Sequence, residues 1–200
     1  MGSCTPLLDA SHLATHLFKL RFSDGRYRVY RRLGERFADQ YVYESDRFGG
    51  GCVMVWAGIC HDGRTQLKIV QGTMNAVKYR DDIRDPIVLP FLQQRNFDRV
   101  FQHGNARCHV ARQNFLNQNH IRVLPWPALS PDLSPIEYIW DELGRRVRHR
   151  QNQPETLQEL RDVLVHEWNN IPHSFIQRLI GSMRRRCEAV VAARGCHRRY

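Results

Sequence analysis

The sequence predicts an α/β protein with a mixed β-sheet and an all-helical C-terminal part, on the strength of three observations. Residues 52–60, CVMVWAGIC, form a nearly continuous apolar run with the length of a strand that is buried on both faces. Strand and helix patterns alternate between residues 99 and 127. From residue 136 onward, apolar residues recur with the 3.6-residue period of an α-helix.

Further strands are predicted on both sides of this apolar run. Residues 17–22 and 26–32 flank the turn signal Ser23-Asp24-Gly25, a pattern typical of a hairpin in which Asp24 is a turn former. The turn signal His61-Asp62-Gly63 leads into another strand at 66–72. Then follow a strand at 99–103, a helix at 111–119 and a strand at 121–127. This order matches an RNase H-like layout, in which a mixed five-stranded sheet is flanked by helices.

The remaining segments are predicted to be helical. Residues 75–94 carry apolar side chains one helical face apart, interrupted by Pro86 and Pro90, which predicts a kinked helix or two short ones. Three more apolar stripes lie at 136–147, 157–168 and 175–190. Residues 1–16 show no clear period, so we expect a divergent, weakly ordered segment there and a domain that spans 17–200.

Composition favours one folded domain with an anionic partner. The chain has 200 residues, of which 42% are hydrophobic and 25% charged, as in ordinary globular domains. Its net charge of +10 favours nucleic acid, bound non-specifically through its phosphates. Because neither a signal peptide nor an apolar run of about 18 residues is present, we expect no membrane association and a nuclear location. No small-molecule substrate is expected.

The proline-rich segment at 124–147 carries the most informative acidic residue. Ser134, Pro135 and Glu137 have the spacing of a helix N-cap, its first residue and its third, which predicts a capping box. On spacing alone, Glu137 is either a capping residue or a catalytic acid.

The segment WPALSPDLSPIEYIWDEL at 126–143 resembles the hallmark of mariner-superfamily (Tc-type) cut-and-paste DNA transposases. The resemblance continues in unbroken order over roughly residues 18–200. It implies a DDE catalytic domain, in which three acidic side chains hold two divalent metal ions, Mg²⁺ or Mn²⁺, for attack on a phosphodiester. It also implies DNA as the substrate and a homodimer as a candidate assembly.

The resemblance assigns the acidic positions unevenly. The third acid falls on Glu137, whereas Gly104 stands where the family pattern QxDNAxxH has its second acid. Asn105 and His109 match near-site residues of that pattern, although His109 is equally suited to a capping or packing role. Between Gly104 and Glu137 lie the 32 residues 105–136, two fewer than this branch of the family usually keeps.

The first acid has two candidate registers. Counting back from Phe18 without gaps gives Ala14, whereas matching LDASHL to the family motif gives Asp9 and needs an insertion. We select Asp9, together with Glu137, as the catalytic and metal-binding candidates. The loss of the second acid predicts a catalytically impaired domain; the alternative is a domesticated, non-catalytic module that binds DNA or protein.

Two basic runs near the C-terminus are candidates for DNA binding. They are either solvated helix faces or contacts to DNA phosphates. No helix-turn-helix pattern precedes the domain in this sequence, so we expect DNA binding that is largely non-specific. The residues concerned are Arg145, Arg146, Arg148, Arg150, Arg184, Arg185 and Arg186.

Overall fold

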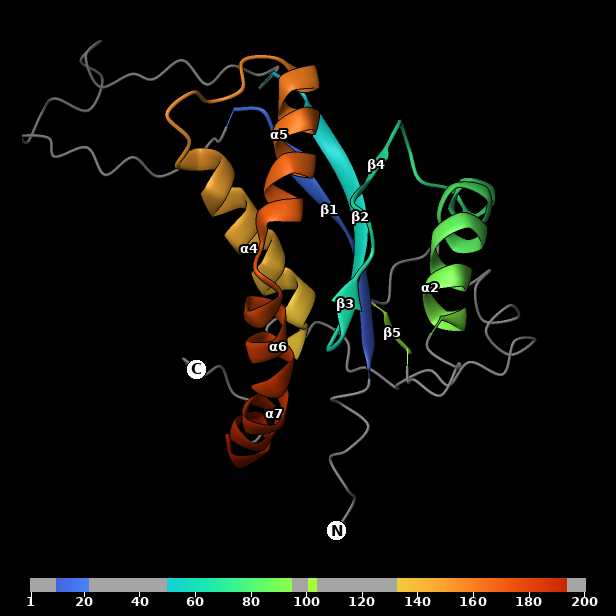
Figure 1. The fold of residues 1–200 in the computed structure, drawn as a ribbon, viewed down its shortest axis with the longest axis vertical. Coiled ribbons are helices and arrows are strands. Elements are labelled where there is room, and N and C mark those ends of the chain that lie inside the picture. Colours follow the sequence, from blue (N-terminus) through green and yellow to red (C-terminus); the bar gives the residue numbers. More distant parts are fainter. Residues whose placement is uncertain (1–9, 22–49, 95–100, 104–132, 194–200) are drawn as a thin grey trace, which may run out of the picture.

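The computed structural model describes residues 10–21, 50–94, 101–103 and 133–193 (Figure 1). Its centre is a mixed sheet of five strands, in which β3, β2, β1 and β5 follow one another and β4 also pairs with β2. The strands are β1 (Ser11–Lys19), β2 (Cys52–Cys60), β3 (Gly63–Arg64), β4 (Lys68–Val70) and β5 (Phe101–His103). Among these described strands, β1 and β5 pair in parallel, and the pairs that involve β2 are antiparallel.

Strand β2 is the middle of the sheet, as its apolar run predicts. It pairs with β1 along nearly its whole length, from Cys52 opposite Lys19 to Ile59 opposite His12. Its other edge pairs with β4 near its start and with β3 near its end. The prediction of a buried central strand is confirmed. The single strand predicted at 66–72 is shorter than expected, Lys68–Val70, and the short strand β3 begins already at Gly63, inside the predicted turn.

Strand β1 corrects the expectation for residues 1–16. Ser11 to His16 belong to this strand and lie next to the centre of the sheet, so the ordered domain begins before residue 17. The sequence hides this strand because its first two residues, Ser11 and His12, are polar yet fully buried. Buried polar residues erase the alternation by which a half-buried strand is recognised.

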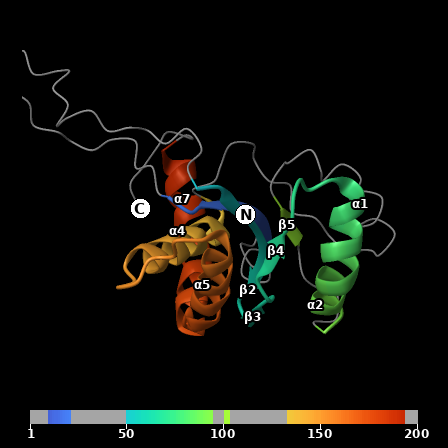
Figure 2. The ribbon, with the colours of Figure 1, turned by 90° about the horizontal axis from the view of Figure 1, so that it is seen from above.

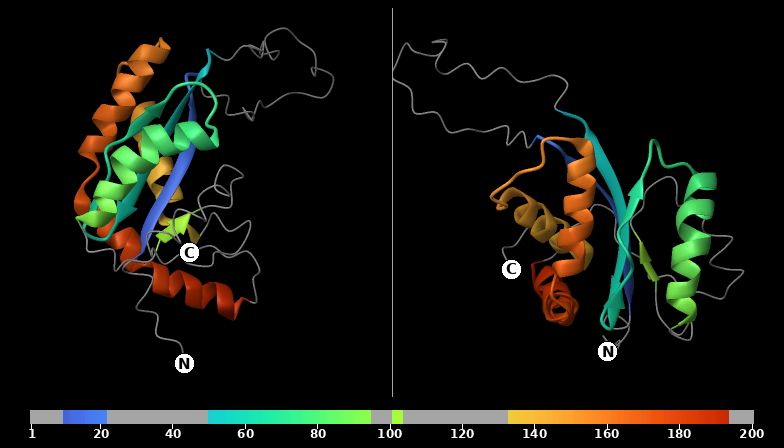
Figure 3. Two further views of the ribbon diagram at one scale, coloured as in Figure 1. Left: turned by 90° about the vertical axis from the view of Figure 1, so that its right-hand side faces the viewer. Right: turned by 45° about the horizontal axis from the view of Figure 1, so that its top comes forward.

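Helices cover both faces of the sheet, as the side-on views show (Figure 3). On one face lies a continuous helical segment made of α1 (Ala76–Tyr79), η3 (Arg80–Val88) and α2 (Leu89–Gln93). On the other face lie the C-terminal helices, and the view from above separates the two layers clearly (Figure 2). These helices are α4 (Pro135–Arg148), α5 (Leu157–Asn170), α6 (His173–Gly181) and α7 (Met183–Ala192).

The predicted kink at Pro86 takes the form of a π-helical stretch. Residues Arg80–Val88 are π-helical, and Pro86 lies inside them. Proline cannot donate a backbone hydrogen bond, and a local π-helical segment is one way for a helix to continue past it. Pro90 follows directly in α2, two residues after the π-helical stretch ends at Val88.

Two hydrophobic clusters fill the space between the layers. The larger joins β1 and β2 to the C-terminal helices and includes Phe18, Val55, Trp140 and Trp168. The smaller joins the other face of the sheet to the η3 side and includes Leu13, Trp56 and Ile83. Residues 13 and 18 therefore point to opposite faces of β1, as strand geometry requires.

The C-terminal stripes predict α4 and α5 closely. Ile136, Ile139, Leu143 and Val147 are all buried, as are Leu160, Leu164 and Trp168. The third stripe corresponds to two helices, not one, because the helix is interrupted at Ser182, which ends α6 and precedes α7. The indole N–H of Trp168 donates to the carbonyl of Thr65 over 3.0 Å, which ties α5 to the loop after β3.

Candidate functional site

Glu137 lies in the first turn of α4, as the sequence predicts. Ser134 is the N-cap with extended backbone, Pro135 is the first helical residue, and the amide of Glu137 donates to the Ser134 carbonyl over 3.2 Å. The predicted capping box is wrong, however, because the Ser134 side chain makes no cap hydrogen bond. The helix start is therefore set by Pro135 and the backbone, and capping does not account for Glu137.

The carboxyl group of Glu137 is in an unfavourable setting for a negative charge. Burial raises its pKa, and the nearby carboxylate of Asp141, one helical turn further along, raises it again. Such a group would be stabilised by a cation in front of it, as a metal ligand is.

Strand β1 packs against this helix, and strand β5 lies beside β1 in the sheet. They pair in parallel, with Ser11 opposite Phe101, His12 opposite Gln102 and Leu13 opposite His103. The Nδ1–H of His12 donates to Oε1 of Gln102 over 2.9 Å, inside the protein. Burial lowers the pKa of His12 to about 4, against the smaller opposite effect of that hydrogen bond, so the ring is neutral at physiological pH.

The α4 face of β1 is lined by aromatic rings. His16 stacks on Trp140, with ring centroids 5.7 Å apart, and Phe18 meets the same indole edge-on at 6.2 Å. Burial lowers the pKa of His16, opposed by the carboxylate of Asp141. Asp141 thus acts electrostatically on both His16 and Glu137, which brings the start of α4 and the middle of β1 into one neighbourhood.

Among the described residues, Asp141 on the same helix is the acidic neighbour of Glu137, and the adjacent strands add none. The described strands β1 and β5 read SHLATHLFK and FQH, without aspartate or glutamate. Across the described ranges, no group of three histidine, cysteine, aspartate or glutamate side chains is arranged to hold a metal ion. Asp9, Gly104, Asn105 and His109 lie outside the described residues, so their predicted roles stay predictions.

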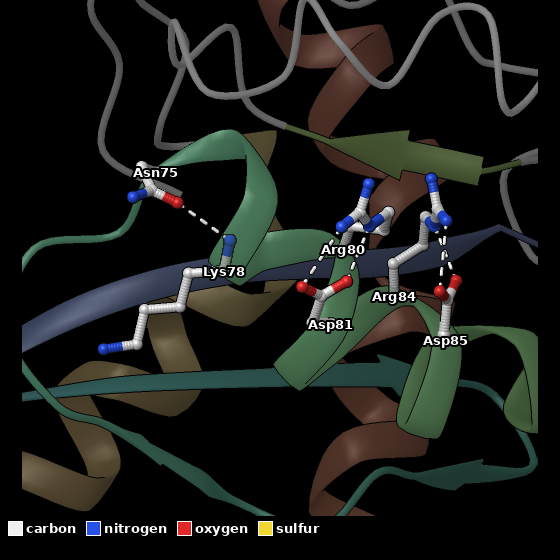
Figure 4. A network of polar contacts seen from close by, with 6 residues as sticks. All are labelled: Asn75, Lys78, Arg80, Asp81, Arg84 and Asp85. Carbon is white, nitrogen blue, oxygen red and sulfur yellow. Dashed lines mark hydrogen bonds and ion pairs between the residues drawn. The ribbon is translucent and has the colours of Figure 1, made fainter.

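On the helical segment across the sheet, two aspartates form ion pairs with neighbouring arginines (Figure 4). Arg80 contacts Asp81 and Arg84 contacts Asp85, each through Nε at 2.6 Å. Asn75 caps the start of this helix, its Oδ1 accepting from the Lys78 amide over 2.8 Å. These ion pairs join sequence neighbours at the surface. They lie on the opposite face of the sheet from Glu137 and therefore do not belong to its site (Figure 3).

The four candidate arginines near the end of α4 differ in how freely they could meet DNA. Arg145 and Arg146 both contact Glu142, and Arg146 also donates to the carbonyl of Asn170 over 3.1 Å. Arg150 is paired with Glu167 at 2.5 Å. Arg148 is exposed. Arg145, Arg146 and Arg150 therefore contact carboxylates of the protein itself.

The arginines of α7 do not form one exposed face. Arg184 and Arg185 are exposed, and Arg184 pairs with Glu188 at 3.0 Å. Arg186 is only 7% exposed, and its guanidinium carbon lies 4.0 Å from the ring centroid of Tyr138. The expectation that Arg186 contributes to a solvated basic surface is therefore wrong; its spacing of three from the buried Met183 is the signal that could have revealed this.

A mixed sheet between two helical layers, with a glutamate at the start of the helix that packs on β1, defines a domain of the RNase H-like α/β class. Residues 21–161 match the family model of the DDE superfamily endonucleases. The chain belongs to this family and is a catalytic domain of the Tc1/mariner transposase type. The resemblance noted in the sequence is thereby confirmed.

Named relatives support this membership. The chain is 34% identical to the transposable element Tcb1 transposase of Caenorhabditis briggsae over 189 residues, covering 92% of this chain and 67% of the relative. It is 35% identical to the Tc1 transposase of Caenorhabditis elegans over 188 residues, with the same coverage. It thus spans about two thirds of the length of these relatives.

Solved structures agree on the fold. The catalytic domain of Mos1 mariner transposase superposes with a TM-score of 0.72 at 19% identity, covering 98% of this chain and 87% of that one. A chain of the pre-cleavage Mos1 transpososome gives 0.75 at 21% identity, and there this chain spans 58% of the neighbour. The predicted RNase H-like fold class is confirmed.

Proposed function

We propose that this chain is a transposase-derived DDE endonuclease and strand-transferase domain whose catalysis is impaired. The observation that carries the proposal is the acid content of the parallel strands β1 and β5. Glu137 stands at the start of α4, but described β1 and β5 contain no carboxylate, and Gly104 follows β5 in the sequence where the family pattern has aspartate. A lone glutamate cannot hold two metal ions.

The family's metal requirement sharpens the argument. Structures of the Mos1 catalytic domain include ones with Mn and with Mg. Two such ions would neutralise the scissile phosphate and stabilise the attacking and leaving oxygens, and they need several oxygen ligands from the protein. The donor set of the described residues does not fit this pair of ions, because Glu137 stands without a second acid on β1 or β5.

DNA remains the proposed partner. The net charge of +10 and the exposed Arg148, Arg184 and Arg185 favour phosphate contacts that read no sequence. A homodimer is part of the same proposal, since the neighbours include Mos1 paired-end complexes. A nuclear location is proposed because DNA is the proposed partner. Within the described part of the chain, no helix is long and apolar enough to span a membrane.

A nicking assay tests the proposal. Purified protein is incubated with supercoiled DNA in Mg²⁺ or Mn²⁺, beside Glu137→Ala, and both should give the same background. Gly104→Asp alone should recover little, because ligands must be held within about 0.5 Å of working geometry. Metal-dependent nicking by the unmodified chain that Glu137→Ala abolishes would establish an active enzyme instead.

The retained charge also favours a second candidate, a domesticated module that binds DNA without cutting it. Filter binding at increasing salt distinguishes it from an inert remnant. Affinity that falls steeply with salt and needs no metal supports the binding module. Equal affinity at low and high salt, or a strong preference for one sequence, contradicts the electrostatic account.

A further inference from the structure

We propose that Ala14, and not Asp9, occupies the position of the first acid, so that this chain has lost the first carboxylate as well as the second. This inference deepens the proposed function and rests on it. It follows from the register of the parallel pair, from the face of β1 on which each residue lies, and from the lack of a substitute ligand nearby.

The register sets which residue of β1 stands level with the end of β5. Leu13 pairs with His103, the last residue of β5. Ala14 follows Leu13 in β1, and Gly104 follows His103 in the sequence. Side-by-side positions on paired strands are about 4.8 Å apart, the separation at which two carboxylates can share a metal ion. The residue of β1 one step past the described pairing is therefore Ala14.

The face of the strand gives the same answer. Ala14 packs against the larger cluster, which contains Ile136 and Trp140 of α4. Leu13 belongs to the smaller cluster across the sheet. Because side chains alternate along a strand, residue 15 lies on the face of Leu13 and not on that of α4. A carboxylate at position 14 would face the helix that carries Glu137, whereas one at position 13 or 15 would not.

The same arguments do not support Asp9. It precedes the first residue of β1 by two positions and Ala14 by five. The described pairings of β1 begin at Ser11, so the register gives residue 9 no support. The ungapped count from Phe18 also ends on Ala14. The register of β1 and the uninterrupted alignment thus agree, and the insertion that Asp9 requires is unnecessary.

The histidines of β1 do not replace the missing ligand. His12 already donates from Nδ1 to Gln102 and is fully buried. His16 lies on the α4 face of β1 but is stacked on Trp140. An imidazole in this position would in any case suit softer metals than Mg²⁺, which prefers oxygen. The α4 face of β1 therefore presents a methyl group where the family chemistry needs a carboxylate.

The test measures Mn²⁺ binding by titration calorimetry, with no DNA present. We expect no binding by the unmodified chain or by Gly104→Asp. The double variant Ala14→Asp/Gly104→Asp should gain at least tenfold in affinity, lose that gain on Glu137→Gln, and keep it on Asp9→Asn. The matched control, Thr15→Asp/Gly104→Asp, places the carboxylate on the other face and should gain nothing.

Other outcomes overturn the assignment. Tight binding by Gly104→Asp alone that Asp9→Asn abolishes would make Asp9 the first acid. Each variant is checked for cooperative thermal unfolding, and the series is repeated with two residues inserted after Arg112 to restore the family spacing. If the folded double variant binds no better than Gly104→Asp in either length, the proposal fails. The proposed function has a separate test. It fails if the unmodified chain nicks DNA, whatever the Mn²⁺ titrations show.

Discussion

The guanidinium of Arg186 covers the ring of Tyr138, with its central carbon 4.0 Å from the ring centroid. The contact joins α7 to the first turn of α4, one residue after Glu137. A cation over an aromatic face is worth about 2 kcal/mol when it is shielded from water, and Arg186 is buried. This arginine therefore holds the C-terminal helices together near the candidate site.

The first prediction separates Arg186 from its neighbours. Arg186→Ala should lower the free energy of unfolding by about 2 kcal/mol in urea titrations and leave the salt dependence of DNA binding unchanged. The matched control, Arg184→Ala with Arg185→Ala, should leave stability nearly intact. If both side chains contact phosphates, it should reduce the slope of log affinity against log salt by up to about 1.8. A lowered salt slope in a fully stable Arg186→Ala protein would contradict this division of roles.

The sequence predicts the parts of this fold whose pattern and burial agree. Strand β2 is apolar throughout, and α4 and α5 each bury one regular stripe. The predicted strand at 17–22 overlaps the end of β1, but the first part of β1 escapes prediction because buried His12 is satisfied by Gln102, a partner 90 residues away that no local pattern reveals. Arg186 escapes for a similar reason, since its partner Tyr138 lies on another helix.

The candidate site also has one part that the sequence predicts and one part that it does not. Glu137 can be found from the sequence because a proline-led helix start is a local signal, and its place in α4 agrees. The first acid cannot be fixed locally. The choice between Asp9 and Ala14 depends on the pairing of β1 with β5, which is a tertiary relationship.

A second prediction concerns the close approach of β1 and β2 at Gly58. A Cβ atom on this residue would lie 2.0 Å from Cδ2 of Leu13 and 3.3 Å from Cγ2 of Thr65. Leu13 is buried in the smaller cluster and has little room to move. Gly58→Ala should therefore cost about 1–3 kcal/mol of stability.

A double-mutant cycle checks the cause. Leu13→Ala alone should also destabilise, by about 2–5 kcal/mol, because it leaves a cavity. Combining it with Gly58→Ala should cost clearly less than the sum of the two, since each change relieves the other. Additive costs would mean that the Leu13 contact is not what excludes a side chain at residue 58.

A third prediction is a loss of stability in mild acid that depends on His12. Its pKa is lowered from 6.5 to about 4 in the folded protein, chiefly by burial. Between these values the unfolded chain takes up a proton and the folded chain does not, so stability falls as pH falls. The loss should be about 2 kcal/mol between pH 6.5 and pH 5.

The measurement is the free energy of unfolding in urea across that range, for the unmodified chain and for His12→Asn. The variant should lose most of the slope, whatever its absolute stability. His16, whose pKa burial also lowers against the opposing effect of Asp141, adds a smaller slope of the same sign. Glu137, with a raised pKa, opposes both. Exposed His173→Asn is the control, and an equal loss of slope there would refute the assignment to His12.

The last prediction is that Glu137→Gln stabilises the protein at neutral pH when no divalent metal is present. Burial and the carboxylate of Asp141 raise the pKa of Glu137, so its ionised form is less favourable in the folded chain than in the unfolded one. The stabilisation that this group gives is complete below the unfolded pKa of 4.5 and is lost as pH rises through the folded pKa.

In EDTA at pH 7, Glu137→Gln should raise the melting temperature by up to about 3 °C, because the group is half-exposed and its effect on the free energy stays below about 1 kcal/mol. At pH 4 the gain should shrink, since Glu137 is then largely protonated.

Glu142→Gln, in the same helix, is the matched control with the opposite sign. Burial raises the pKa of Glu142, but hydrogen bonds from Arg145 and Arg146 outweigh that effect and hold it below its usual value. Its replacement should lower the melting temperature at pH 7. Repeating the series in Mn²⁺ links stability to the proposed function. The metal should change the melting temperature of neither the unmodified chain nor Glu137→Gln. A rise in the melting temperature of the unmodified chain alone would reveal a working metal site around Glu137.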